Sequence, residues 1–119
     1  MEQPEHILQV ECIKWFRLQY PQYYWNLFAI PNGGKRNIGT AKKLKAEGVV
    51  SGVADLFLAI PCEIFHGLFI EMKIKPSGAS ANQKKFGIEM AKEGYQWVLI
   101  YTFDEFRNYV NNWMKTAKK

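Results

Sequence analysis

The stretch from Gly67 to Lys73, GLFIEMK, decides the fold, because it is an apolar run that carries two charged residues at alternate positions. Successive side chains of a strand point to opposite faces, so Glu71 and Lys73 share one face. The run is stopped by Pro76, which predicts a strand over residues 67–75. A charged pair on such an apolar strand is the first candidate for a functional site.

A second apolar strand is predicted just upstream, over residues 55–60, between a glycine-rich turn and Pro61. It begins with Asp55, one of only two aspartates in the chain. If the two strands pair as a hairpin, the start of one lies beside the end of the other. Asp55, Glu71 and Lys73 would then form one cluster on a rigid sheet.

The rest of the chain predicts four helices and two more strands around this hairpin. Proline and glycine mark most of their ends. The last strand is very apolar, so we expect it at the centre of the sheet. The order αβαββαβα indicates a single α/β domain over residues 1–119, a mixed sheet flanked by helices. The expected helices are 4–19, 40–48, 80–93 and 104–115, and the further strands are 23–30 and 96–102.

The first predicted helix places an acidic residue, Glu11, in the middle of an apolar stripe. A buried charge without a partner is costly, so this position suggests that Glu11 reaches the cluster from the side. The opposite side of the helix is also apolar and suggests a partner surface. The stripe comprises Ile7, Leu8, Trp15 and Leu18, and the opposite side Val10, Ile13 and Phe16.

Composition excludes several classes of protein. The 119 residues are 48% hydrophobic and 23% charged, as in an ordinary globular domain. No apolar run approaches the roughly 20 residues of a membrane span, and the acidic N-terminus is unlike a signal peptide, so we expect a cytoplasmic protein. The isolated Cys12 and Cys62 are expected to be buried thiols, since no cluster of cysteine and histidine suggests zinc. The net charge of +5 is compatible with a nucleic-acid partner.

Two carboxylates held close together repel each other and favour a cation between them. Hard ions such as Mg²⁺ or Mn²⁺ bind carboxylate oxygens, lower the pKa of bound water and stabilise charge on a phosphate. Asp55 and Glu71 could hold such an ion, and Lys73 could orient the water or neutralise the phosphate. The alternative is a solvated ion pair on an exposed strand, with Asp55 as a turn cap.

These residues resemble the motifs of a known nuclease family. The segment Gly39–Leu56, GTAKKLKAEGVVSGVADL, is similar to the family segment that ends in G-x-P-D, and GLFIEMK to its E-x-K strand. Ser80 with Gln83 resembles its S-x-x-Q helix start, and Gly94-Tyr95 its turn before the final strand. The family is the VRR-NUC (virus-type replication-repair nuclease) domain of the PD-(D/E)xK superfamily. The resemblance covers essentially the whole chain and is closest to stand-alone, phage-type members.

The resemblance implies a role for each matching residue. Asp55 and Glu71 would be the principal ligands of Mg²⁺ or Mn²⁺, with the Met72 carbonyl completing the shell. Lys73 would be the catalytic lysine, Glu11 the acidic residue of the first helix and Gln83 an additional motif residue. The sequence departs from the family pattern at Ala54, which replaces the usual proline. Proline fixes the backbone but supplies no chemistry, so we expect alanine to be tolerated.

Gln83 has a second interpretation, because Ser80-x-x-Gln83 is also a capping box, in which glutamine binds back to the N-cap amide. Capping alone and capping with an added role at the site both remain open at this point.

Basic residues recur near the proposed site and predict contacts with DNA phosphates, although each group alone is typical of a solvated surface. A glycine-rich loop followed by two cations suits backbone contact with phosphate. The candidates are Asn32, Gly33, Gly34, Lys35, Arg36, Lys42, Lys43, Lys45 and Lys84.

The sequence therefore predicts a metal-dependent DNA endonuclease. The resemblance implies a homodimer acting on branched DNA, as Holliday-junction resolvases do, and a partner copy would allow symmetric cuts. Three alternatives remain: a nickase or flap nuclease without junction preference, a DNA-binding module without catalysis, and a purely structural domain.

Overall fold

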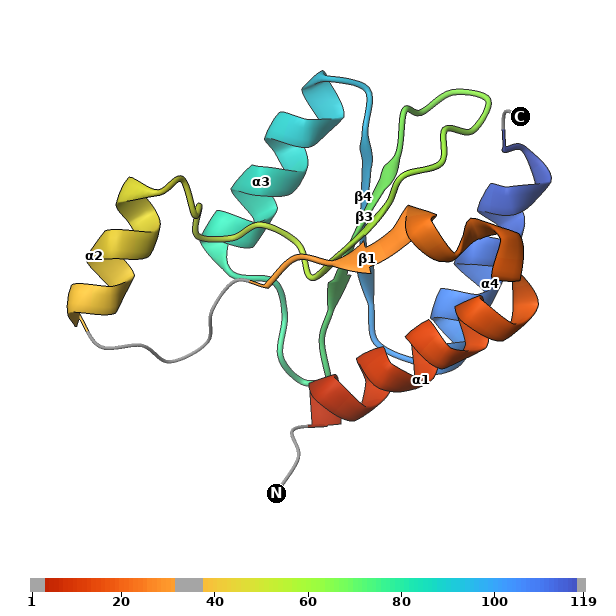
Figure 1. Ribbon diagram of the computed structural model, residues 1–119, viewed down its shortest axis with the longest axis horizontal. Coiled ribbons are helices and arrows are strands. Elements are labelled where there is room, and N and C mark those ends of the chain that lie inside the picture. The colour runs from red at the N-terminus through yellow and green to blue at the C-terminus, as the bar shows by residue number, and fades with distance from the viewer. Residues whose placement is uncertain (1–3, 32–37, 118–119) are drawn as a thin grey trace.

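The predicted order of helices and strands is present in the computed structural model, which describes residues 4–31 and 38–117 (Figure 1). One short 3-10 helix, η1, is added before the first strand. The elements are α1 (Pro4–Gln19), η1 (Pro21–Asn26), β1 (Leu27–Ala29), α2 (Ile38–Ala46), β2 (Leu56–Leu58), β3 (Leu68–Met72), α3 (Ala81–Lys92), β4 (Gln96–Ile100) and α4 (Phe103–Lys115).

The described strands form one mixed sheet in the order β1-β2-β3-β4. β1 pairs with β2 and β2 with β3 in antiparallel fashion, and α3 connects β3 to β4 as a parallel pair. The expected hairpin of β2 and β3 is therefore confirmed. The central position expected for β4 is wrong, because β4 lies at the edge of this sheet. Helices cover both of its faces: Ile100 lies in the core with residues of α1 and α4, and on the opposite face Gly87 of α3 leaves no room for a Cβ beside the ring of Trp97.

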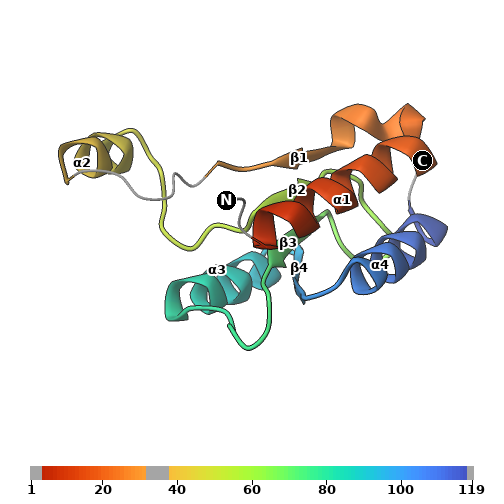
Figure 2. The ribbon, with the colours of Figure 1, turned by 90° about the horizontal axis from the view of Figure 1, so that it is seen from below.

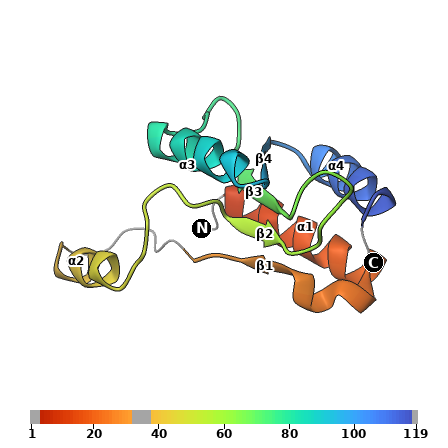
Figure 3. The same cartoon turned by 90° about the horizontal axis from the view of Figure 1, so that it is seen from above.

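The two faces of the sheet are covered differently (Figures 2 and 3). α1 and α4 pack on the face that carries Leu56 and Ile70, and α3 packs on the opposite face. α2 stands apart from the other helices and strands in all three views. The core between the sheet and the two terminal helices includes Leu8, Cys12, Phe16, Leu56, Leu58, Leu68, Ile70, Met72, Phe106, Val110 and Trp113.

The buried stripe of α1 differs from the predicted one. Leu8, Cys12 and Phe16 are buried, whereas Glu11 is exposed and Leu18 is 85% exposed. α1 is apolar on most of its circumference, so periodicity alone could not tell which stripe faces the sheet. Of the three residues expected on a partner surface, Phe16 belongs to this core and Ile13 is partly buried and packs against it.

The expected strand over residues 23–30 is also shorter than predicted. Pro21 begins η1, and the Tyr23 amide donates to the Tyr20 carbonyl, so the aromatic segment forms a helical turn before β1. The two cysteines are free and buried, as expected. Within residues 4–31 and 38–117, the structure contains no helix with the length and apolar character needed to span a membrane.

Candidate active site

The pairing of β2 with β3 brings the predicted cluster together. Leu56 lies opposite Ile70, so Asp55, directly before β2, lies next to the end of β3. The Met72 amide donates a hydrogen bond of 2.7 Å to Oδ2 of Asp55. This contact fixes the orientation of the Asp55 carboxylate relative to the strand that carries Glu71. Ala54, where the family usually has proline, is completely buried.

Glu71 is the one charged residue buried in the described part of the chain, with 2% of its surface exposed. Burial, the negative charge of Asp55, a hydrogen bond with Asp55 and the charge of Glu5 together raise the pKa of Glu71 to about 9, although Lys73 lowers it. Its Oε1 atom is buried and has no hydrogen-bond partner. The fold therefore holds a carboxylate in an environment that disfavours its charge, with one oxygen still free to bind a cation.

Gln83 caps α3 and also contacts Glu71, so the structure contains the capping box together with a contact at the cluster. The side-chain Oε1 of Gln83 accepts a hydrogen bond from the backbone amide of Ser80 at 2.8 Å. The backbone amide of Gln83 donates to Oγ of Ser80 at 3.2 Å, and the two bonds form a capping box at the start of α3. Its Nε2 donates to Oε2 of Glu71 at 3.1 Å. One side chain thus begins the helix and orients the buried carboxylate.

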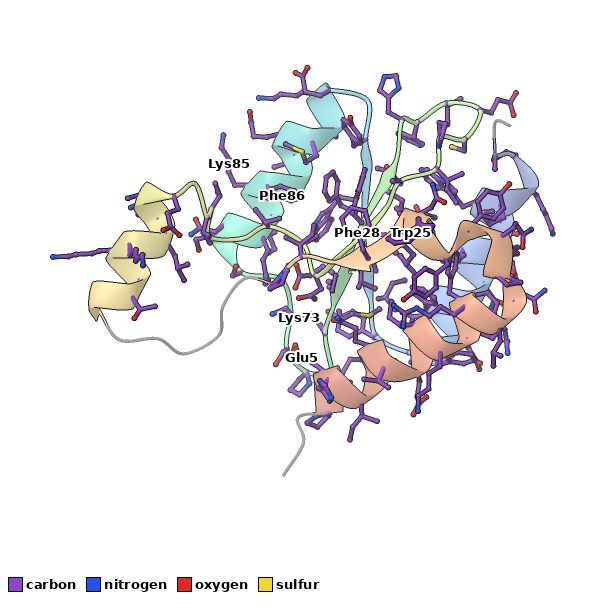
Figure 4. The ribbon with its side chains drawn as sticks, viewed as in Figure 1. Glu5, Trp25, Phe28, Lys73, Lys85 and Phe86 are labelled. Carbon is purple, nitrogen blue, oxygen red and sulfur yellow. The ribbon has the colours of Figure 1, made fainter. Side chains whose placement is uncertain are left out.

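Of the two acidic residues of α1, Glu5 is the one whose charge bears on Glu71, and the role expected for Glu11 stays a prediction. The charge of Glu5 contributes to the raised pKa of Glu71, and Figure 4 shows Glu5 at the same end of the sheet as Lys73. Glu5 precedes Leu8 and Cys12 at helical spacing, so it extends the true buried stripe by one turn towards the site. The predicted stripe did not include Glu5, because Cys12 was not counted among the apolar residues of α1. With Cys12 included, the spacing of Glu5, Leu8 and Cys12 indicates a common stripe.

A cleft of about 690 Å³ opens beside the cluster. Asp55 and Gln83 line it from the body of the domain, and α2 and residues 48–53 line it from the other side. Gly52, in the 48–53 segment, packs closely against the start of α3. It has a φ of +94°, and a Cβ at this position would lie 2.6 Å from the Asn82 backbone. Nδ2 of Asn82 also donates to Oγ of Ser51 at 3.1 Å.

No family model and no curated protein matches this sequence. Among solved structures, a chain named VRR_NUC domain protein is similar in fold, with a TM-score of 0.85 and 26% sequence identity. The match covers 99% of this chain and 93% of the other. This chain folds as a VRR-NUC domain. The family resemblance read from the sequence is confirmed, and so is the α/β fold with a mixed sheet flanked by helices.

The donor set of this VRR-NUC domain fits a hard divalent cation. Among the described residues, no three acidic, histidine or cysteine side chains lie close enough to hold a metal by themselves. Mg²⁺, however, commonly binds through one or two carboxylates and keeps several waters. Asp55, together with the unpartnered oxygen of Glu71, supplies such a pair. Met72 is buried beside them, and the ligand role of its carbonyl stays a prediction.

The structure separates the basic residues that were expected to contact DNA. Residues 32–36 lie outside the described part of the VRR-NUC domain. Lys42, Lys43 and Lys45 are exposed on α2, but of these three only Lys45 lines the cleft. Lys84 is exposed on α3, directly after Gln83. The positive charges nearest the cleft therefore come from two different helices.

Proposed function

We propose that this VRR-NUC domain, a nuclease-type domain by its structural neighbour, is a divalent-metal-dependent endonuclease that hydrolyses DNA phosphodiester bonds. The observation that carries the proposal is the buried Glu71 carboxylate, whose free oxygen lies beside Asp55 at the edge of an open cleft. Burial next to a second carboxylate disfavours the charged form of Glu71, and a cation between the two carboxylates removes that cost.

Each residue of the cluster has a distinct part in this mechanism. Asp55 and Glu71 hold Mg²⁺ or Mn²⁺, and the Met72 amide and Gln83 orient their carboxylates. When bound, such an ion lowers the pKa of a water and stabilises charge on a phosphate. Lys73 lies on the same strand face as Glu71 and offers an ammonium group to the attacking water or the phosphate. Glu5 adds negative charge at the side of α1.

DNA binding is proposed to involve the positive charges around the cleft. Lys45 lines the cleft, Lys84 directly follows Gln83 on α3, and Lys42 and Lys43 extend the charge along α2. Phosphate contacts of this kind position the backbone without reading the sequence. Residues 32–36 are proposed to add backbone and cationic contacts.

Branched DNA is the proposed substrate, with a homodimer as the active form, because symmetric cuts in a junction need two sites related by a two-fold axis. The alternatives are a nickase or flap nuclease, and a DNA-binding module without catalysis. The α1 surface that the sequence suggested for the dimer does not support it, since Phe16 is buried in the core and Ile13 packs against it.

The test is cleavage of labelled four-way junction, flap and duplex DNA with Mg²⁺, Mn²⁺ or EDTA. Glu71→Gln and Lys73→Ala remove the proposed chemistry, and Glu63→Gln, on an exposed loop at the other end of the hairpin, is the control. We expect cutting that is lost in EDTA and in both site variants. Paired symmetric cuts support the junction substrate, and binding without cutting under every metal overturns the catalytic proposal.

A further inference from the structure

We propose that the cleft lined by α2, the 48–53 loop, Asp55 and Gln83 is a subsite for an unpaired nucleotide next to the bond that is cut. The substrate would then carry a single-stranded segment at the site of cleavage. This inference rests on the proposed nuclease function, but it concerns a different group of residues and is tested by binding rather than by cleavage.

The size of the cleft favours a nucleotide over a duplex. Its volume of about 690 Å³ falls in the range of roughly 300–1,000 Å³ that is typical of pockets for small organic molecules. A base inside a duplex is stacked and paired, and it can enter such a pocket only after leaving the stack. A nucleotide that is already unpaired avoids most of this cost.

The chemistry of the cleft matches the two parts of a nucleotide. Leu44, Val49 and Val50 give it an aliphatic wall, and Val50 is 59% exposed. Bases held outside a duplex pack against apolar side chains and use their polar edges for hydrogen bonds. Lys45 on the same wall supplies a positive charge for a phosphate, and Gln83 and Asp55 place the subsite directly beside the buried carboxylate.

The isolation of α2 points to a ligand that packs against it. α2 has nine residues and stands apart from the rest of the domain, and helices below about 12–15 residues are marginal on their own. Its cleft side includes Ala41 and Leu44, so an occupant would bury these residues. A second copy of the chain fits less well than a polyanion, because α2 carries three exposed lysines and the chain already has a net charge of +5.

The experiment measures oligonucleotide binding to full-length Glu71→Gln protein by fluorescence anisotropy. The probes are a 15-nucleotide single strand, a blunt duplex and the same duplex with a single-stranded tail. In this background, Val50→Asn makes the cleft wall polar without changing charge. Ile64→Asn is the matched control, because Ile64 is an aliphatic residue with 77% exposure in the 61–66 loop at the far end of the hairpin.

We expect the tailed duplex to bind more tightly than the blunt one. Val50→Asn should weaken binding of the tailed duplex by roughly fivefold or more, as expected for loss of packing against one base, and leave the blunt duplex unchanged. Ile64→Asn should change neither. Hydrogen exchange of the α2 amides should slow when the single strand binds.

Equal affinity for tailed and blunt duplex, no binding of any probe, or equal effects of the two substitutions would overturn the proposal. A Val50→Asn variant that loses self-association while binding DNA normally would assign the cleft to a second copy instead. The nuclease proposal can fail separately. If wild-type protein binds the tailed duplex more tightly than the blunt one but cuts no probe with Mg²⁺ or Mn²⁺, the subsite is supported and the catalytic proposal is overturned.

Discussion

At the scale of single residues, the buried Glu71 carboxylate is unfavourable in its charged form, and a bound cation would stabilise that form. Burial, the charge of Asp55 and a hydrogen bond with Asp55 favour its protonated form, whereas the charge of Lys73 favours the charged form. The balance leaves the pKa of Glu71 near 9, so the metal-free protein holds a proton at neutral pH. Metal binding must displace this proton, and it is therefore expected to strengthen as pH rises.

The same group makes the metal-free stability depend on pH. Between about pH 5 and pH 9 the folded protein retains a proton that the unfolded chain has released, since the ordinary pKa is near 4.5. The free energy of unfolding therefore falls as pH rises through this window. Glu71→Gln cannot titrate, so it should flatten this fall and raise the Tm in EDTA at pH 8. Thermal unfolding from pH 5 to 9 measures both effects, with Glu63→Gln as the control that keeps the wild-type slope.

The two roles of Gln83 can be separated with Ser80. Ser80→Ala removes the hydroxyl that caps α3 but leaves the Gln83 contact with Glu71, so we expect a loss of about 1 kcal/mol in stability with cleavage retained. Gln83→Ala should cost a similar amount of stability and also reduce cleavage about tenfold, because the buried carboxylate loses its orienting donor. Denaturant unfolding and initial cleavage rates measure the two quantities. Equal cleavage by both variants would show that Gln83 acts only as a cap.

At the scale of elements, α3 connects the site to the cleft wall. Its first turn carries the capping box and Gln83, and Asn82 on the same turn binds the loop that leads from α2. Further along, the absence of a side chain at Gly87 lets α3 approach Trp97 on β4. The position of α3 therefore fixes both the orientation of Glu71 and the anchor of the 48–53 loop.

This anchor depends on Gly52. Gly52→Ala adds a Cβ that meets the Asn82 backbone at 2.6 Å and also strains a residue with positive φ. Gly48→Ala is the matched control, because Gly48 also has positive φ but has nothing within 4 Å of its Cβ position. We expect Gly48→Ala to cost about 1 kcal/mol and Gly52→Ala clearly more, with faster hydrogen exchange in the 48–53 loop only in the latter. Equal losses would mean that the loop moves aside freely.

At the scale of the whole molecule, local pattern predicted the hairpin and its charged cluster but not the packing of α1. The cluster of Asp55, Glu71 and Lys73 follows from strand alternation and from the antiparallel pairing of two strands that are neighbours in sequence. Glu5 and Glu11 both lie on an apolar helix, and only contact with the sheet decides which of them faces the site. The edge position of β4 likewise depends on the covering helices, because a strand packed on both faces is apolar wherever it lies in the sheet.

The distribution of charge over the molecule gives the last prediction. If DNA phosphates bind along the cleft wall, Lys45→Ala should weaken binding of a labelled oligonucleotide and lower the slope of log affinity against log salt by about one. Lys92→Ala is the control, because Lys92 lies at the far end of α3 and is paired with Glu89 at 2.8 Å. Both variants remove one positive charge, so a general effect of net charge would lower the two slopes equally. A reduction confined to Lys45→Ala places the phosphate path on the α2 side of the buried carboxylate, and equal reductions would contradict that path.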